Sequence, residues 1–185
     1  MSQQSTTRSV VLVLGGVRSG KSRYAQELAT RGKQVAFIAT AEACDDDMRQ
    51  RITRHREDRP ASWTTFEAPL ALEDTLLQCG DRFDTVLIDC LTVWTANVMQ
   101  HEADDSHRVL ARVDRLAEIL RSVSANVILV SNEVGSGIHP NTAIGRSYRD
   151  LLGFVNQRVA AAADQVILLV AGCPLAVKSP AEARA

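Results

Sequence analysis

The sequence predicts an α/β fold in which helices cover both faces of a mostly parallel sheet. Short apolar runs rich in β-branched residues recur along the chain, as expected of strands that are buried on both faces. Segments with apolar residues at helical spacing separate these runs, and strands that alternate with helices build parallel sheets. No linker, internal repeat or change of composition interrupts the 185 residues, so we expect one domain over residues 1–185.

The first strand and the first helix enclose a phosphate-binding motif. Residues 10–14 form the apolar run, and residues 15–22 match the pattern G-x-x-x-x-G-K-[ST] without a mismatch. Helical spacing follows to about residue 31, where Gly32 ends the helix. Backbone N–H groups of such a loop point at phosphate oxygens, and its lysine reaches the β and γ phosphates in a catalytic role. The predicted nucleotide-binding residues are Gly15, Gly16, Val17, Arg18, Ser19, Gly20, Lys21 and Ser22.

The remaining elements follow in chain order. Strands are expected at residues 34–40, 85–89, 126–131 and 165–170, with a turn and short extended piece around 63–67 and a further edge strand at 175–178 that closes a C-terminal hairpin. Helices are expected at residues 48–58, 69–78, 91–99, 108–122 and 141–162. Residues 1–8 and 179–185 are expected to be flexible.

The strand at residues 85–89 ends in an acid. Val86, Leu87 and Ile88 precede Asp89, and this order resembles a Walker B element. Asp89 would then lie beside Ser22, and both residues would hold Mg²⁺ directly or through water. The alternative interpretation is a strand-ending aspartate that caps the next helix.

Charge and composition disfavour several classes of function. The formal net charge is −1, which gives no field that would hold nucleic acid or an anionic membrane. No apolar stretch approaches about 18 residues, so we expect neither a signal peptide nor a membrane span. The four cysteines form no C-x-x-C pair, and we expect reduced thiols and a cytoplasmic location.

The helix expected at residues 48–58 is strongly basic. Its arginines, together with Arg59, can attract a triphosphate and neutralise charge that develops at phosphorus. They also disfavour protonation of His55, and a neutral imidazole is what a nucleophile requires. The alternative is a solvated surface histidine without a catalytic role.

Several motifs together resemble one enzyme family. They are the phosphate loop, the strand end at residues 38–40, the Asp-Asp-Asp-Met sequence at 45–48, residues 54–60 followed by Trp63, the loop at 132–135, and residues 155–158. Over about residues 9–178 the chain is similar to the bifunctional adenosylcobinamide kinase and adenosylcobinamide-phosphate guanylyltransferase family of cobalamin biosynthesis. The resemblance implies a RecA-like P-loop fold and a homotrimer.

The resemblance also implies two reactions and their site residues. A nucleoside triphosphate phosphorylates the aminopropanol hydroxyl of adenosylcobinamide, and GTP then transfers GMP to that phosphate, which gives adenosylcobinamide-GDP and pyrophosphate. The transfer passes through a GMP-histidine, and the matching position is His55. The implied guanine-nucleotide contacts are Gly15 to Ser22, Ala39, Thr40, Ala41, Arg56, Glu57, Asp58, Arg59, Glu67 and Asp89.

Two positions depart from the family pattern. Arg54 stands where a histidine often precedes the guanylylated one, which removes an ambiguity about the nucleophile. The acid that ends the Walker B strand can be glutamate in the family, whereas Asp89 is shorter by one methylene group. Contact with Mg²⁺ through water is therefore one expectation.

Several alternatives remain open in the sequence. A plain P-loop small-molecule kinase would use His55 only to bind phosphate, and a non-catalytic nucleotide-binding assembly subunit would bind no corrinoid. Glu133 is either a base that orients water or an acceptor that stabilises its own loop. His101, His107 and His139 are expected at the surface, with His139 also a candidate for the substrate site. The sequence does not fix the choice of ATP or GTP for the kinase step, the guanine-reading residues or the corrinoid-binding residues.

Overall fold

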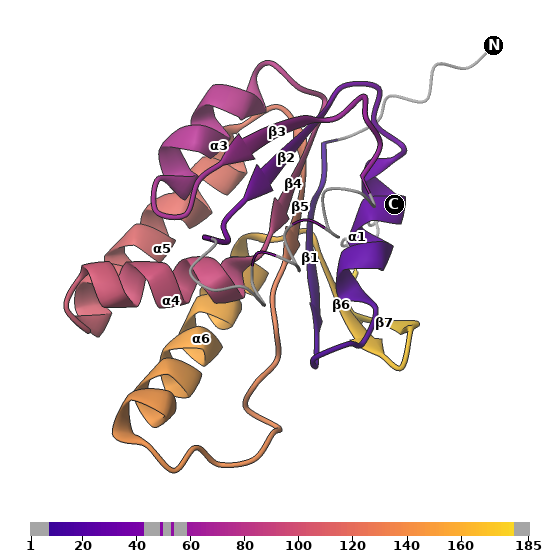
Figure 1. The fold of residues 1–185 in the computed structure, drawn as a ribbon. Helices are drawn as coiled ribbons and strands as arrows, with labels where there is room; N and C mark the ends of the chain where they lie inside the picture. The colour runs from indigo at the N-terminus through magenta and orange to yellow at the C-terminus, as the bar shows by residue number, and fades with distance from the viewer. Residues whose placement is uncertain (1–7, 43–48, 50–52, 54–58, 180–185) are drawn as a thin grey trace, which may run out of the picture.

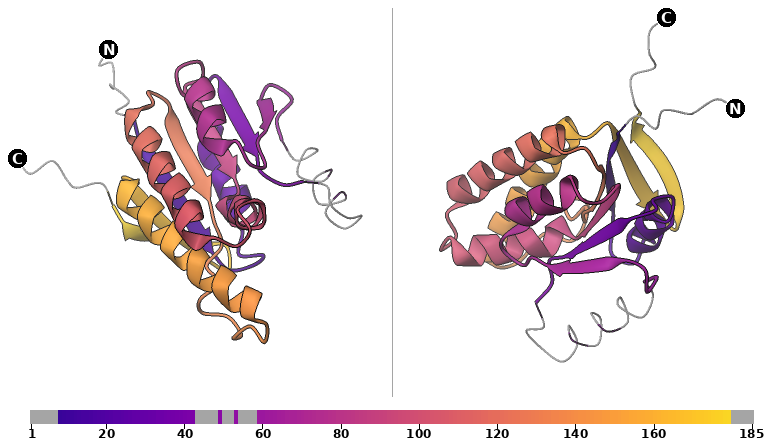
Figure 2. Two further views of the ribbon diagram at one scale, coloured as in Figure 1. Left: turned by 90° about the vertical axis from the view of Figure 1, so that its left-hand side faces the viewer. Right: turned by 90° about the horizontal axis from the view of Figure 1, so that it is seen from above.

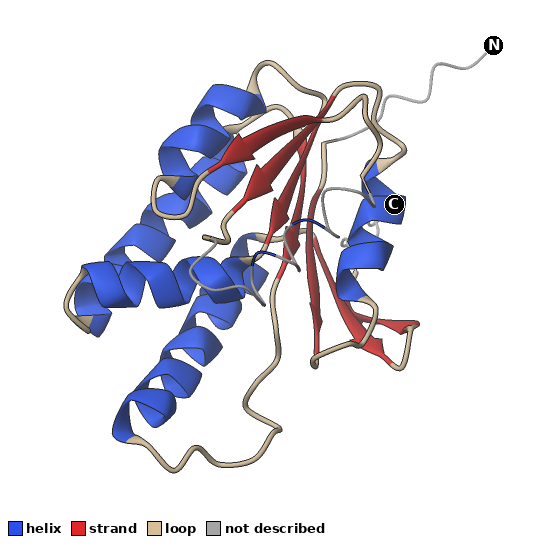
Figure 3. Ribbon diagram, in the orientation of Figure 1, coloured by secondary structure: helices blue, strands red, loops and turns tan. Residues whose placement is uncertain are grey.

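A seven-stranded sheet forms the centre of the fold (Figure 3). The computed structural model describes residues 8–42, 49, 53 and 59–179. Its strands are β1 (Val10–Gly15), β2 (Val35–Ala39), β3 (Thr64–Glu67), β4 (Thr85–Asp89), β5 (Asn126–Val130), β6 (Gln165–Val170) and β7 (Cys173–Lys178). They lie in the order β3-β2-β4-β5-β1-β6-β7, with β1 to β6 parallel and β7 antiparallel to β6. The predicted parallel α/β sheet and its C-terminal hairpin are confirmed.

Helices cover both faces of this sheet, as predicted. They are α1 (Lys21–Ala29), α3 (Leu72–Gly80), α4 (Leu91–His101), α5 (Ser106–Ser122) and α6 (Ala143–Ala162). Helix α1 lies on one face and the other four lie on the opposite face (Figures 1 and 2). The alternation of side chains along β1 serves both layers, because Val10 and Leu12 pack in the cluster with α3 to α6, whereas Val11 and Val13 pack in the cluster with α1.

Three helices begin at residues other than those expected, and polar contacts explain each difference. Helix α6 begins at Ala143, two residues after the expected position 141, because Thr142 Oγ1 accepts a hydrogen bond from the Gly145 N–H at 3.2 Å as the N-cap. Helix α5 begins at Ser106, because the Asp105 carboxylate accepts hydrogen bonds from the N–H groups of His107 at 2.9 Å and Arg108 at 3.3 Å. Helix α3 begins at Leu72, three residues after the expected position 69. The carbonyls of Pro69 and Leu70 accept side-chain hydrogen bonds from Asn97 and Arg112, so they are not available to a helix.

The basic helix expected at residues 48–58 lies largely outside the described residues. Arg49 and Thr53 are helical, and the Thr53 hydroxyl donates to the Arg49 carbonyl at 2.9 Å. His55, Arg56, Glu57 and Asp58 lie outside the described residues, as do both segments expected to be flexible, except for residues 8 and 179. In the described part of the chain, no helix combines the length and the apolar character needed to cross a membrane.

An ion pair between the buried Glu73 and the half-buried Arg112 joins α3 to α5. Arg112 Nε donates to Glu73 Oε1 and Arg112 Nη2 donates to Glu73 Oε2, both at 2.8 Å. Arg112 Nη2 also donates to the Leu70 carbonyl, and the guanidinium lies 5.5 Å from the centroid of the Trp94 ring. The Glu73 side chain is only 4% exposed, so its charge depends on this partner.

Replacing Arg112 with Met should lower the free energy of unfolding by about 3–5 kcal/mol, because Glu73 would remain buried and unpaired. Urea denaturation followed by circular dichroism measures the change. The matched control is the double replacement of Glu73 and Arg112 by Met, which should recover most of the loss, since no buried charge remains. A single variant as stable as the wild type would show that the pair contributes nothing.

Candidate functional site

The phosphate loop turns sharply between β1 and α1, and glycines make the turn possible. A Cβ atom added at Gly15 would lie 2.6 Å from both the Leu169 carbonyl oxygen and Ser19 Oγ. Gly20 adopts a φ of 96° as the residue before α1, and no side chain caps the helix. The first turn of α1 also carries no acidic residue. Its N-terminal N–H groups are therefore left for an anion.

Lys21 lies folded over the loop that precedes it. The residue is 8% exposed, and its Nζ donates to the Gly16 carbonyl at 2.6 Å. Burial lowers the pKa of Lys21, while the nearby Cys90 and Asp89 raise it. An ammonium group with one protein hydrogen bond and little water is well placed to pair with phosphate oxygens.

Two neighbouring segments fix the backbone of the loop. The Glu133 N–H, just after β5, donates to the Gly15 carbonyl at 3.0 Å. The Gly172 N–H, in the turn between β6 and β7, donates to the Ser19 carbonyl at 3.0 Å. Gly172 has a φ of 83°, and a Cβ atom added at Gly20 would lie 3.5 Å from its Cα. The C-terminal hairpin therefore braces the loop, a role that sequence reasoning missed.

The carboxyl ends of the strands bring the predicted site residues into one line. Glu67 pairs with Ala39 across β3 and β2, and Ala39 pairs with Asp89 across β2 and β4. Asp89 in turn pairs with Val130 of β5, and Val130 pairs with Val13 of β1, just before the phosphate loop. The structure thus places Glu67, Ala39 and Asp89 on the same edge of the sheet as Lys21.

Thr40 joins two of these strand ends. Its side chain is fully buried, its hydroxyl donates to the Cys90 carbonyl at 2.8 Å, and its Oγ1 accepts from the Cys90 N–H at 2.8 Å. The Thr40 N–H donates to the Asp89 carbonyl at 3.3 Å. Ala41, one residue further along, is partly exposed. The structure assigns Thr40 a clear positioning role, whereas nucleotide contact at Thr40 and Ala41 stays a prediction.

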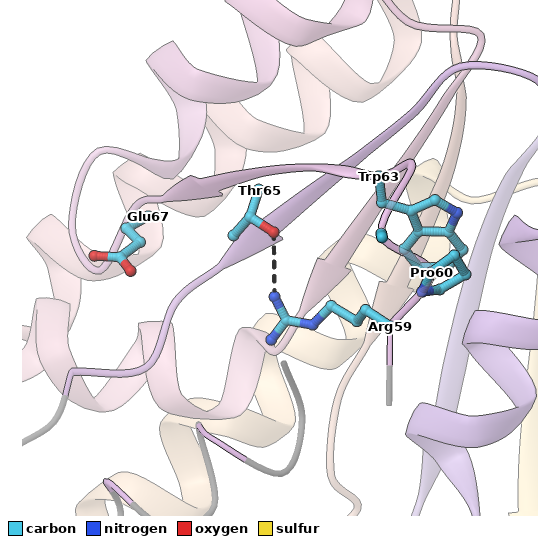
Figure 4. A pocket seen from close by; sticks show the side chains of 6 residues that line it. Arg59, Pro60, Trp63, Thr65 and Glu67 are labelled. Atoms are coloured by element: carbon cyan, nitrogen blue, oxygen red, sulfur yellow. Dashed lines mark hydrogen bonds between the residues drawn. The ribbon is translucent and has the colours of Figure 1, made fainter. Parts of the chain in front are cut away.

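A pocket of about 480 Å³ opens along β3 (Figure 4). Its lining residues are Arg59, Pro60, Ala61, Trp63, Thr65 and Glu67. The Arg59 guanidinium lies 3.5 Å from the centroid of the Phe37 ring, and Arg59 Nη1 is 3.4 Å from Thr65 Oγ1. The pocket combines a cation, an indole and a carboxylate, which are groups that suit a nucleotide.

Ser22 and Asp89 offer the oxygen atoms that Mg²⁺ prefers, a hydroxyl and a carboxylate. Asp89 ends β4 at the same edge of the sheet as the phosphate loop, and its charge partly opposes the burial that lowers the pKa of Lys21. Among the described residues, no group of three or more His, Cys, Asp or Glu side chains could hold a metal by itself. The donor set fits Mg²⁺ that keeps several water and phosphate ligands.

Glu133 stabilises its own loop, which was one of the two alternatives. Its Oε1 accepts from the Gly135 N–H at 2.8 Å and its Oε2 accepts from the Ser136 N–H at 3.1 Å. Burial raises the pKa of Glu133, but these hydrogen bonds outweigh it and the pKa is lowered. A carboxylate engaged at both oxygens is a poor general base, and the acceptor role explains its position.

Two half-buried amides also support the edge of the sheet, and sequence reasoning assigned a structural role to neither. Asn97 Nδ2 donates to the carbonyls of Thr40 at 2.9 Å and Pro69 at 3.2 Å. Asn156 Nδ2 donates to the Asn132 carbonyl at 2.9 Å, and Asn156 Oδ1 accepts from Ser131 Oγ at 2.7 Å. The available signal was an amide on an otherwise apolar helix face, because such an amide needs a partner.

Comparison with known proteins places this site in a family. The profile described as "Cobinamide kinase / cobinamide phosphate guanyltransferase" matches residues 11–177. The chain is 43% identical to the bifunctional adenosylcobalamin biosynthesis protein CobP of Pseudomonas aeruginosa, over 90% of this chain and 96% of that protein. It is 38% identical to the bifunctional adenosylcobalamin biosynthesis protein CobU of Salmonella typhimurium, over 91% of this chain and 99% of that protein.

The fold alone has wider relatives. A solved ATPase from the type III secretion system of pathogenic bacteria superimposes with a TM-score of 0.58 at 10% identity, over 88% of this chain. This chain spans 51% of the ATPase chain, so the likeness concerns the P-loop core. Since the phosphate loop, the acid that ends β4 and nearly the whole length fall within the profile match, the chain belongs to the cobinamide kinase / cobinamide phosphate guanyltransferase family.

Proposed function

We propose that the chain phosphorylates adenosylcobinamide with a nucleoside triphosphate and then transfers GMP from GTP to the new phosphate. The products of the second reaction are adenosylcobinamide-GDP and pyrophosphate. The observation that carries this function is the family match over residues 11–177, which contains the complete phosphate loop. GTP serves the transfer, and ATP or GTP serves the kinase step.

The kinase step uses the phosphate loop. The N–H groups at the start of α1 and the ammonium of Lys21 hold the β and γ phosphates, with Lys21 leaving the Gly16 carbonyl to do so. The aminopropanol oxygen attacks the γ phosphorus, its proton passes to solvent water, and the nucleoside diphosphate leaves. Bound Mg²⁺ supplies further charge neutralisation, and Ser22 and Asp89 are the residues that we propose hold it.

The transfer step uses His55 as a covalent nucleophile. A neutral imidazole nitrogen attacks the α phosphorus of GTP, a P–N bond forms, and pyrophosphate leaves. A phosphate oxygen of adenosylcobinamide phosphate then attacks the same phosphorus and displaces His55. The arginines that neighbour His55 in the sequence favour this neutral form and neutralise charge at phosphorus.

Further nucleotide contacts are proposed along the aligned strand ends. The proposed residues are Ala39, Thr40, Ala41, Arg56, Glu57, Asp58, Arg59, Glu67 and Asp89. The pocket beside β3 supports the assignment of Arg59 and Glu67, because both line it, and Glu67 lies in register with Ala39. In this arrangement GTP extends from the phosphate loop along the edge of the sheet.

We also propose that each chain forms one domain and that three chains assemble into a homotrimer. The proposed location is the cytoplasm. The exposed edge strand β7 is consistent with assembly, because all six of its residues are exposed and it carries Leu175 at 58% and Val177 at 63% exposure. Neither nucleic acid nor a membrane is a proposed partner.

Guanylylation of His55 is directly testable. Wild-type protein incubated with Mg²⁺ and GTP labelled at the α phosphate should retain label that acid removes and alkali does not, as expected of a phosphoramidate. His55→Ala should retain none, whereas the control His101→Ala, at an exposed histidine of α4, should match the wild type. If the wild-type protein binds GTP but takes up no label, the GMP-histidine proposal is wrong and a plain P-loop kinase becomes the favoured function.

Asp89→Asn should raise the Mg²⁺ concentration needed for half-maximal kinase rate by about tenfold to a hundredfold, because the variant loses a negative charge beside the metal. Titration of Mg²⁺ at saturating nucleotide measures this shift. Asp104→Asn is the matched control, since Asp104 is exposed and its φ of 63° suits asparagine. An unchanged Mg²⁺ dependence in Asp89→Asn would contradict the proposed metal site.

A further inference from the structure

The apolar face of α6 continues beyond the sheet that covers it. Leu151, Leu152, Val155 and Val159 of this helix are buried, and Tyr148 packs against the same cluster. The helical period places Ile144 on this face, one turn before Tyr148, yet Ile144 is 59% exposed. The core therefore ends before the apolar stripe does.

The segment that leads into α6 adds a second uncovered isoleucine. Residues 131–142 form a long loop that projects, with the first turns of α6, past the end of the sheet where β5 stops (Figures 1 and 3). Ile138 in this loop is 97% exposed. Ile138 and Ile144 are thus two large aliphatic side chains that one projecting segment exposes to water.

This segment is ordered by its own polar contacts. Thr142 caps α6 by accepting from the Gly145 N–H at 3.2 Å, and Arg146 Nη1 donates to the Pro140 carbonyl at 3.2 Å. Arg149 Nη1 lies 2.6 Å from His139 Nδ1, and Arg149 Nε and Nη2 donate to Asp150 Oδ1 at 3.2 Å and 3.1 Å. Because a guanidinium only donates, His139 Nδ1 accepts, and the imidazole keeps its N–H at Nε2 as a further donor.

The projecting segment begins at the phosphate loop. The Glu133 N–H donates to the Gly15 carbonyl, and Val17 in the phosphate loop is itself 80% exposed. The other strongly exposed aliphatic side chains among the described residues are on α3 and on the β6–β7 hairpin. A substrate bound to the projecting segment would thus share one edge of the sheet with the nucleotide phosphates.

We propose that Ile138 and Ile144, flanked by His139, Arg146 and Arg149, form the surface that binds the corrin macrocycle of adenosylcobinamide and its phosphate. The inference rests on the proposed function. A corrin ring offers apolar faces to the isoleucines and a rim of carboxamides to the donors of His139 and the arginines. Arg146, which donates one hydrogen bond to the Pro140 carbonyl, also suits the phosphate that the substrate gains in the first reaction, whereas Arg149 is paired with Asp150.

Binding of adenosylcobinamide to the protein alone, without nucleotide, tests this surface. Equilibrium dialysis in dim light, read by corrin absorbance, should give a dissociation constant about tenfold higher for Ile138→Asn and for Ile144→Asn than for the wild type. The matched control is Leu77→Asn on α3, at a residue that is 41% exposed, and it should bind the corrinoid as the wild type does. Unchanged affinity in both isoleucine variants would overturn the inference.

Two parallel measurements separate the remaining outcomes. Covalent GMP uptake requires no corrinoid, so it reports on the nucleotide half of the site, and light scattering reports on assembly. If the isoleucine variants lose corrinoid binding and also have a lower molar mass by light scattering, the surface joins copies of the chain and the inference is wrong. If they lose GMP uptake as well as corrinoid binding, the surface supports the nucleotide site and the inference is also wrong. Wild-type protein that binds the corrinoid but transfers neither phosphate nor GMP would refute the proposed function and leave the inference standing.

Discussion

Parallel pairing at the sheet edge is the constraint on which the site depends. In-register partners run from Glu67 through Ala39 and Asp89 to Val130, and from there to Val13 before the phosphate loop. Because parallel strands all end at the same edge, one sheet collects side chains that are far apart in the sequence. A shift of one residue in any strand would turn its terminal side chain to the opposite face.

Local patterns were sufficient to predict most of the fold. Five apolar runs predicted strands that pair in parallel, and the residues of the phosphate loop follow from one contiguous motif. The start of α5 was misplaced, because an N-cap by Asp105 was not recognised. The start of α3 was misplaced for another reason. Asn97 of α4 and Arg112 of α5 donate hydrogen bonds to the carbonyls of Pro69 and Leu70, which an earlier helix start would need for its own hydrogen bonds.

Contacts between distant residues account for what sequence reasoning did not find at the site. Gly172 lies in the turn between β6 and β7, yet its N–H donates to the Ser19 carbonyl across more than 150 positions of the sequence. Asn97 and Asn156 each share a helix with a glutamine, and only the tertiary structure shows which carbonyls the two asparagines serve. Glu133 remained ambiguous until both of its oxygen atoms had identified donors.

The brace between Gly172 and Ser19 has a consequence for the order in which the chain matures during synthesis. The phosphate loop is made early, but its supports come from residue 133 and then from residue 172. Ribosomes deliver the N-terminal part first, at roughly 5–20 residues per second. The phosphate loop therefore gains its last supporting hydrogen bond only when almost the whole chain has been made. A polypeptide released before the last hairpin lacks the hydrogen bond from Gly172 to Ser19.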